Sequence, residues 1–239
     1  MAVHLTFDID WAPDWAIDVV LDILTRKAVK ATFLITHATD RLRSIQHEGH
    51  EVGIHPNFDV ASTQGGTVEA VMAYLEEIAP NARVMRSHGL LMSTAILERA
   101  LRQNKHIQYD LSLLTLGVPL TTKIPWRFNG QTCDRLNYSW EDDLFFDTVD
   151  YGWRPLFESN SLAIANFHPI HVSLNTSNFS QYDRYRSTNV ASNSTGYTAK
   201  QHVFANSNES ARGAYDALMY TIENHECISF EELLCELES

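Results

Sequence analysis

Short apolar runs alternate with segments of helical periodicity through the first half of the chain. Near-continuous apolar runs are typical of parallel strands that are buried on both faces. After the first run, Ile17, Val20, Leu21 and Leu24 recur at the spacing that places them on one face of a helix. Four such alternations predict an α/β protein built on a parallel sheet or barrel. The predicted strands are 3–10, 30–36, 51–55, 82–85 and 107–113, and the predicted helices are 14–27, 39–48, 67–78 and 94–104.

The second half of the chain is less regular. Residues 172–208 are rich in Ser, Asn and Thr, and they predict a polar loop insertion, since so long a polar stretch in a compact domain is usually a functional loop. Ser229 opens a capping box before the last predicted helix. No repeat or linker divides the chain, so we expect a single domain. Further patterns predict strands at 123–128, 145–149 and 162–168 and a helix at 210–224.

The composition is that of an ordinary globular protein. The 239 residues can bury a sizeable core, and 44% of them are hydrophobic against 20% charged. The net charge of −12 argues against a nucleic-acid partner, because phosphate binding needs a basic surface. The charge leaves neutral partners such as sugars open.

We expect a cytoplasmic protein. The first strand begins within three residues, with no secretory signal pattern, and no apolar run approaches the roughly 18 residues of a membrane span. The three cysteines lack metal-binding spacing and are interpreted as reduced thiols; they are Cys133, Cys227 and Cys235. The sequence does not predict an oligomeric state.

Two carboxylates lie at the end of the first predicted strand. Asp8 and Asp10 are two residues apart, which places both on one side of a strand. In α/β proteins the carboxyl ends of the strands form the ligand-binding edge. Two neighbouring negative charges repel each other, and a bound metal ion would explain their proximity. The alternative is that they cap the helix that begins near Asp14.

His55 and Asp59 follow the third predicted strand and are four residues apart. On a helical turn this spacing places both side chains on one face, and imidazole with carboxylate suits Zn²⁺ or another first-row divalent ion. Together with Asp10 they would form a site with open positions for water and substrate. Alternatively, Asp59 caps a loop and His55 is an interior histidine. His50 lies at the opposite end of the same strand and is interpreted as structural.

His168 follows the late strand, where a histidine can act as a general acid near neutral pH. His171 is the competing candidate. Asp110 could orient the acid, as carboxylates do in acid–base pairs, or could cap a turn. Arg86 could hold a carboxylate in its ionised form, or form a surface ion pair. Of the polar residues at strand ends, His88 has the weakest pattern.

These motifs, in this order, resemble those of the polysaccharide deacetylase family (NodB homology, carbohydrate esterase family 4). Thr6-Phe7-Asp8-Ile9-Asp10 is similar to the first motif, Thr-Phe-Asp-Asp-Gly, in which one Asp is the base and the next a metal ligand. The other matching segments are 30–33, 49–55, Arg86, 110–112 and His168. The form of the motifs, with Trp11 and its His-Pro pairs, resembles deacetylase-like proteins of bacterial surface-polysaccharide (O-antigen) biosynthesis.

The chain departs from the family pattern in three places. Ile9 separates the two carboxylates of the first motif, Asp59 stands where the family has its second His, and the third motif lacks its Pro at 86–89. We interpret Asp8 as the base and Asp10 as the ligand.

The resemblance implies a distorted (β/α) barrel of about seven parallel strands that removes an N-acetyl group from a sugar. It implies a divalent metal, zinc first with Co, Ni or Mn as alternatives, held by Asp10, His55 and Asp59. The implied substrate is a nucleotide sugar, a lipid-linked glycan or a free oligosaccharide. Residues that could stack on a sugar, or pack an irregular loop instead, are Trp153, Tyr182, Tyr185 and Tyr197.

The resemblance also implies the catalytic roles. Asp8, held ionised by Arg86, takes a proton from the attacking water, and His168, oriented by Asp110, protonates the leaving amine. Two alternatives remain at this point. One is a carbohydrate-binding relative without activity, and the other is a hydrolase that opens a small cyclic amide on the same barrel.

Overall fold

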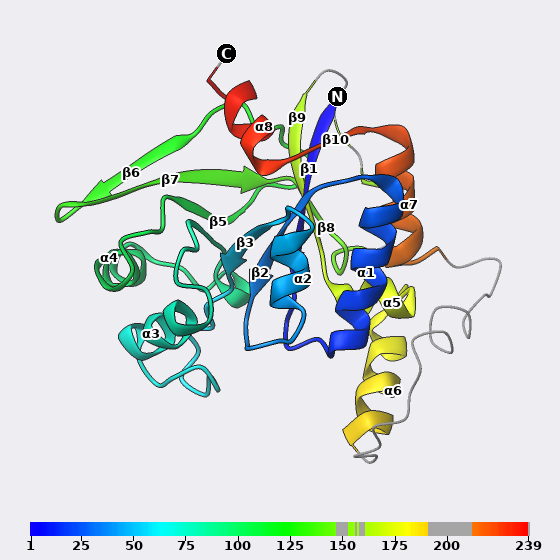
Figure 1. Ribbon diagram of the computed structural model, residues 1–239, viewed down its shortest axis with the longest axis horizontal. Helices are drawn as coiled ribbons and strands as arrows, with labels where there is room; N and C mark the ends of the chain where they lie inside the picture. The colour runs from blue at the N-terminus through cyan, green and yellow to red at the C-terminus, as the bar shows by residue number, and fades with distance from the viewer. Residues whose placement is uncertain (147–152, 156, 158–160, 191–211, 239) are drawn as a thin grey trace.

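The computed structural model describes residues 1–146, 153–155, 157, 161–190 and 212–238 (Figure 1). Its strands are β1 (Ala2–Asp8), β2 (Ala31–Ile35), β3 (Glu51–Ile54), β4 (Val84–Met85), β5 (Tyr109–Leu114), β6 (Ile124–Phe128), β7 (Gln131–Tyr138), β8 (Trp140–Glu141), β9 (Leu162–Phe167) and β10 (Glu226–Ile228). Its helices are α1 (Asp14–Lys27), α2 (Leu42–His47), α3 (Val68–Ile78), α4 (Thr94–Gln103), α5 (Pro169–Leu174), α6 (Phe179–Val190), α7 (Ala214–Asn224) and α8 (Phe230–Glu236), with a short 3₁₀ turn η1 (His88–Leu90).

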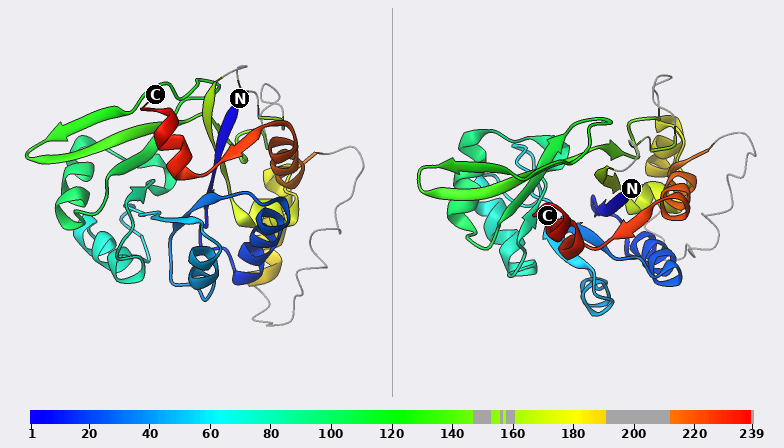
Figure 2. Two further views of the ribbon diagram at one scale, coloured as in Figure 1. Left: turned by 45° about the horizontal axis from the view of Figure 1, so that its top comes forward. Right: turned by 90° about the horizontal axis from the view of Figure 1, so that it is seen from above.

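Within the described ranges, the ten strands belong to one sheet with the order β6-β7-β5-β4-β3-β2-β1-β9-β8, and β10 pairs with β1. All pairs are parallel except the β6–β7 hairpin. The hairpin turns at Asn129 and Gly130, which both have positive φ, as a two-residue hairpin loop requires. It projects from the body of the molecule (Figures 1 and 2).

The segment 131–141 joins the two ends of the parallel sheet. Its first part, β7, pairs with β5, and its last part, β8, pairs with β9. Between them, the Ser139 N–H donates a hydrogen bond to Ile164 O at 2.9 Å. The parallel strands therefore curve into a distorted barrel with one weak seam, and the predicted α/β barrel class is confirmed.

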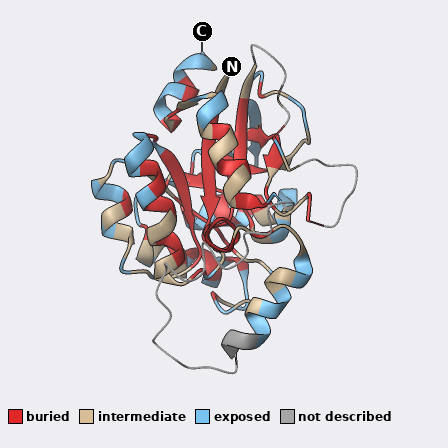
Figure 3. Cartoon of the chain, turned by 90° about the vertical axis from the view of Figure 1, so that its right-hand side faces the viewer, coloured by how far each residue is buried: buried red, intermediate tan, exposed pale blue. Residues whose placement is uncertain are grey.

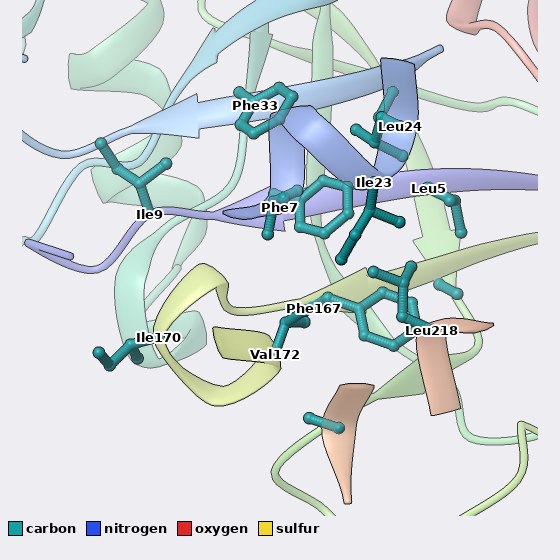
Figure 4. Close-up of a cluster of buried hydrophobic side chains, with 14 of the residues drawn as sticks. Leu5, Phe7, Ile9, Ile23, Leu24, Phe33, Phe167, Ile170, Val172 and Leu218 are labelled. Atoms are coloured by element: carbon teal, nitrogen blue, oxygen red, sulfur yellow. The ribbon is translucent and has the colours of Figure 1, made fainter. Parts of the chain in front are cut away.

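Helices α1, α5 and α7 cover one outer side of the barrel, and burial is concentrated on the strands and the inner helix faces (Figure 3). Alternate residues of β1 face outward into this layer, where Phe7 packs between Phe33 and Phe167 at ring distances of 5.1 and 6.0 Å (Figure 4). Each fully buried side chain of this size contributes about 1.5–3 kcal/mol to folding. Helices α3 and α4 form a second layer against β3 and β4.

The barrel interior contains an apolar cluster and several buried polar side chains. Leu34, Leu111 and Ile164 pack inside with residues of α8, which covers the amino end. The inward residues of β1 beyond this layer are polar, because Thr6 and Asp8 bind partners on the facing strands. The fold thus places buried polar groups at the edge where ligands bind in barrels.

Three sequence predictions differ from the structure. Phe145 and Phe146, predicted to begin a strand, lie in a turn, and residues 147–149 lie outside the described residues. Instead, the polar segment 131–141 forms strands, because its partners β5, β6 and β9 supply the pairing that its own pattern does not indicate. The predicted polar loop contains α6 at Phe179–Val190, and residues 191–208 of it lie outside the described part.

None of the described helices is both long and apolar enough to span a membrane.

Candidate active site

Three side chains from three loops meet at the carboxyl ends of the strands. Asp10 follows β1, His55 follows β3, and His88 begins η1 after β4. Asp10 Oδ1 lies 3.2 Å from His55 Nε2 and 3.1 Å from His88 Nδ1. Among the described residues, these three form a group whose ligand atoms are close enough to share one metal ion.

A strained turn presents Asp10 to this group. Asp10 and Trp11 have φ values of 38° and 55°, a left-handed conformation that costs a non-glycine residue about 1–2 kcal/mol. The Ala12 N–H bonds back to Ile9 O, and the Trp11 N–H donates to Thr36 Oγ1 at 3.0 Å. Ile9 itself is fully buried in the outer core. The residue that interrupts the acidic pair therefore anchors the turn, and strain of this kind is typical of functional sites.

The group fits a divalent cation. Atoms that bind one Zn²⁺ at about 2.0–2.1 Å lie roughly 3.0–3.4 Å from one another, which matches the separations around Asp10 Oδ1. Burial alone would raise the pKa of Asp10, but hydrogen bonds from His55 and His88 outweigh this and hold it well below its usual range. Asp10 is therefore ionised, and one carboxylate with two imidazoles is a common zinc donor set.

The sequence predicts Asp59 as a ligand, but the structure places it outside this group. Its side chain is exposed, and its backbone N–H bonds to Asn57 Oδ1 at 2.9 Å. Residues 55–58 have no helical structure, so a separation of four residues does not bring Asp59 back to His55. The third member of the group is His88, the strand-end residue for which the sequence pattern is weakest.

His168 is fixed beside this group by Asp142. Its Nδ1 lies 2.7 Å from Asp142 Oδ1, and its backbone N–H donates to Asp142 Oδ2 at 2.9 Å. Its Nε2 then faces Asp10 Oδ2 at 3.6 Å. Burial alone would lower the pKa of His168, but the charge and hydrogen bond of Asp142 raise it well above the usual value. Asp142 thus favours the protonated form of His168 and leaves Nε2 facing the group around Asp10.

The sequence predicts that Asp110 orients His168, but in the structure Asp110 has other partners. Asp110 Oδ2 accepts from Arg135 Nε at 2.8 Å, and Oδ1 accepts from the Ser112 N–H at 2.9 Å. Successive strand residues point to opposite faces, and the next residue, Leu111, lies inside the barrel. Asp110 therefore points outward, away from the site.

The predicted contact between Asp8 and Arg86 is confirmed. The Arg86 Nη1–H donates to Asp8 Oδ1 at 2.9 Å, and Nη2 donates to Thr6 Oγ1 at 3.0 Å. Arg86 is fully buried, with its guanidinium 4.2 Å from the centre of the Tyr138 ring. On its other side, Asp8 Oδ2 accepts from Asn166 Nδ2 at 2.9 Å. Two buried hydrogen-bond donors therefore hold the Asp8 side chain in one orientation.

A second acidic group lies next to the first and consists of Asp8, Glu141 and His168. Its carboxylate oxygens already accept hydrogen bonds. Asp8 accepts from Arg86 at Oδ1 and from Asn166 at Oδ2. Glu141 accepts from Asn166 at Oε1 and from Tyr138 at Oε2. A cation there would sit beside a guanidinium and amide hydrogens. The group around Asp10 is therefore the better metal site.

His171 does not compete as the acid. It is buried against Phe146 and Tyr182, at ring distances of 4.9 and 4.7 Å. Burial, together with the charge of His168, lowers the pKa of His171 well below the usual value. It is a neutral packing histidine.

Of the aromatic residues considered for sugar stacking, Tyr182 lies next to the site, and Tyr185 stacks on it at 6.4 Å. Trp153 packs against Tyr220 on α7 at 5.8 Å, and Tyr197 lies outside the described residues. Trp11, whose ring centroid lies 5.3 Å from that of His88, is half-exposed at the rim.

Sequence reasoning missed Glu141, Asp142 and Asn166. Asn166 is two residues before His168 on one strand, so the alternation that pairs Asp8 with Asp10 also indicated it. The acidic run 141–143 was visible, but no predicted strand placed it at the site.

The described geometry agrees with comparisons to known proteins. The model of the WbmS-like polysaccharide deacetylase family matches residues 5–186. A solved structure from Bordetella bronchiseptica, assigned as a polysaccharide deacetylase involved in O-antigen biosynthesis, is 28% identical with a TM-score of 0.70, over 92% of this chain and 89% of that one. A comparison with curated proteins found no match.

Two more distant structures share the fold. A family 4 acetyl xylan esterase from Clostridium thermocellum, in complex with a cobalt ion, is 16% identical with a TM-score of 0.50, over 99% of this chain and 91% of that one. A protein from Mycobacterium smegmatis assigned as a polysaccharide deacetylase is 16% identical with a TM-score of 0.51, over 84% and 89%.

The family match places the chain in a class of enzymes that act on acetylated carbohydrate. Within it, the chain belongs to the WbmS-like polysaccharide deacetylase family.

Proposed function

We propose that the protein is a metal-dependent hydrolase that removes an N-acetyl group from a sugar or glycan precursor of bacterial surface polysaccharide. The observation that supports this most directly is that Asp10, His55 and His88 face the His168–Asp142 pair across a short distance. One side can bind a cation, and the other can deliver a proton. Hydrolysis of an amide needs both.

Zn²⁺ is the ion that best suits one carboxylate and two imidazoles, with Co, Ni or Mn as alternatives. When bound, such an ion polarises the acetyl carbonyl and makes a water molecule more acidic. Asp10, His55 and His88 would hold it. The exposure of His88 and Asp10, whose side chains are 36% and 23% accessible, leaves substrate access to the group.

The protein's own residues then perform the proton transfers. Asp8, held in position by hydrogen bonds from Arg86 and Asn166, accepts a proton from the attacking water. His168 donates its Nε2 proton to the leaving nitrogen, since Asp142 binds Nδ1 and fixes the ring. The carbonyl C–N bond breaks, and acetate and an amine are released.

A surface-polysaccharide substrate is supported by the relative with 28% identity, which is described as involved in O-antigen biosynthesis. The net charge of −12 suits a neutral sugar better than a polyanion. We therefore propose an N-acetylated intermediate of surface-polysaccharide assembly in the cytoplasm.

The test is release of acetate from a panel of N-acetylated sugars, nucleotide sugars and oligosaccharides, with metal content measured by elemental analysis. We expect about one divalent ion per chain and acetate release that is lost in His55→Ala together with the metal. A protein that binds no divalent ion and releases no acetate after incubation with excess Zn²⁺, Co²⁺, Ni²⁺ and Mn²⁺ would contradict the proposal.

A further inference from the structure

Glu141 is a carboxylate at the site to which the proposed reaction gives no role. It is the last residue of β8, and its side chain is 14% exposed. A buried or half-buried carboxylate is costly unless its position serves the structure or the chemistry. Its place next to the proton donor indicates a role in chemistry.

Two hydrogen bonds hold the Glu141 carboxylate in one orientation. The Tyr138 hydroxyl donates to Oε2 at 3.0 Å, and Asn166 Nδ2 donates to Oε1 at 2.8 Å. Both donors are fully buried, and Asn166 is fixed in turn because its Oδ1 accepts from Thr6 Oγ1 at 2.9 Å. Glu141 is therefore a preorganised acceptor whose position does not depend on a bound substrate.

The Glu141 carboxylate lies near His168 Nε2, the atom that delivers the proton in the proposed reaction. Glu141 Oε1 lies 4.0 Å from His168 Nε2. A proton donor must approach the leaving atom of the substrate to about 2.6–3.2 Å. A leaving atom at that distance from Nε2 can also lie within hydrogen-bonding distance of Glu141 Oε1.

We propose that Glu141 accepts a hydrogen bond from the N–H of the scissile amide and thereby selects N-acetyl over O-acetyl substrates. An amide presents a donor to this carboxylate. The bridging oxygen of an ester presents only lone pairs, which a carboxylate repels. A site built around a polar partner discriminates strongly against an analogue that lacks the matching group. This inference rests on the proposed function.

The same contact favours the reaction as it proceeds. The water oxygen bonds to the acetyl carbon, its proton passes to Asp8, and the C–N bond breaks as the nitrogen takes the proton from His168. The nitrogen gains positive character beside the Glu141 carboxylate. With an ester, the leaving oxygen becomes a neutral hydroxyl and gains no such attraction. Glu141 thus binds the amine product as well as the amide substrate.

The kinetic test uses two substrates that differ in one atom, methyl 2-acetamido-2-deoxyglucoside and methyl 2-O-acetylglucoside, or the same pair built on the best glycan from the panel above. We expect Glu141→Gln to lower the amide-to-ester ratio of kcat/KM by at least about tenfold, mainly through the amide. Glu98→Gln is the matched control. Glu98 is similarly accessible, at 12%, but pairs with Arg102 on α4, and its substitution should leave the ratio unchanged.

A second measurement needs no turnover. By calorimetry, the wild-type protein should bind the 2-amino sugar product more tightly than the 2-hydroxy sugar, and Glu141→Gln, which keeps an acceptor oxygen but loses the charge, should show a smaller preference. If Glu141→Gln does not fold, Glu141→Asp keeps the charge but withdraws the carboxylate by one methylene, and it should reduce both preferences.

An unchanged amide-to-ester ratio in a folded Glu141 variant that still releases acetate would overturn the role of Glu141 and leave the deacetylase function standing. A wild-type protein without preference for the amine product would overturn it as well. If the wild-type protein hydrolyses neither substrate class, the proposed function itself fails.

Discussion

Asp142 binds His168 twice, through the imidazole Nδ1 at 2.7 Å and through the backbone N–H at 2.9 Å. The double contact fixes both the ring and the start of α5, for which His168 is the N-cap residue. With Nδ1 engaged, only Nε2 is directed toward Asp10. The orientation of the proposed acid is therefore set by a residue from the β8 segment.

This contact predicts a large effect of Asp142→Asn on catalysis. The amide keeps the shape but removes the charge that stabilises the protonated ring, and kcat for acetate release should fall by about 10²–10⁴-fold. The matched control is Asp110→Asn, which loses an ion pair with Arg135 on the outer face and should leave kcat unchanged. Equal losses of kcat in the two folded variants would contradict the assignment.

His88→Ala should abolish metal binding. The substitution removes one of the three ligand atoms. Loss of an outer-shell partner alone weakens metal affinity about 10–100-fold, so loss of a ligand should weaken the affinity by at least that factor. Titration with Zn²⁺ and elemental analysis measure the effect. Asp59→Ala, which changes an exposed side chain outside the group, should bind metal like the wild type. Metal loss in Asp59→Ala with retention in His88→Ala would restore the ligand set expected from the sequence.

Arg86→Met should destabilise the fold strongly, because it leaves the Asp8 carboxylate buried without its charged partner. Breaking a buried pair from one side costs about 3–5 kcal/mol in the free energy of unfolding. Urea denaturation provides the measurement. In comparison, Arg99→Met breaks an exposed pair with Glu69 and should cost about 0–1 kcal/mol. A small loss for Arg86→Met would show that the pair contributes little.

His4 should make the stability dependent on pH. Burial lowers the pKa of His4 to about 4, whereas an unfolded histidine titrates near 6.5. Between these values the unfolded chain binds a proton that the folded chain does not, so the contribution is complete at neutral pH and is lost as the pH falls from 6.5 to 4. The loss amounts to roughly 3 kcal/mol.

The measurement is the free energy of unfolding at pH 7 and pH 4 for the wild type and for His4→Asn, which keeps a donor for Ile228 O. The wild type should lose roughly 3 kcal/mol more than the variant over this interval. Parallel pH curves for the two proteins would mean that His4 protonates without cost in the fold.

Local pattern sufficed for the regular half of the fold. The strands before residue 114 are recognisable as short buried segments rich in apolar residues, and the helices between them keep a clear apolar face. Side chains directly after these strands, such as Asp10, His55 and Arg86, were found because the barrel brings strand ends together. The segment 131–141 was missed because its polar residues are stabilised by neighbours distant in sequence.

The differences between the predicted and the observed arrangement of the site have a common physical origin. Asp59 was assigned by helical spacing in a segment without helical structure, and Asp110 by proximity to a strand end without regard to which face it occupies. His88 and Asp142 reach the site through loops whose course depends on tertiary packing. Spacing along the chain cannot encode such a course.

The seam where β8 pairs with β9 affects how the protein loses activity on warming. Two residue pairs, Trp140–Ala165 and Glu141–Asn166, join β8 to β9. Short ladders open at lower free energy than the global transition, as hydrogen exchange detects in many proteins. Opening here carries Glu141 and Asp142 away from His168 while the other parallel strands stay paired. Warming should therefore inactivate the molecule before it melts, with the seam as the first region to exchange its amide protons.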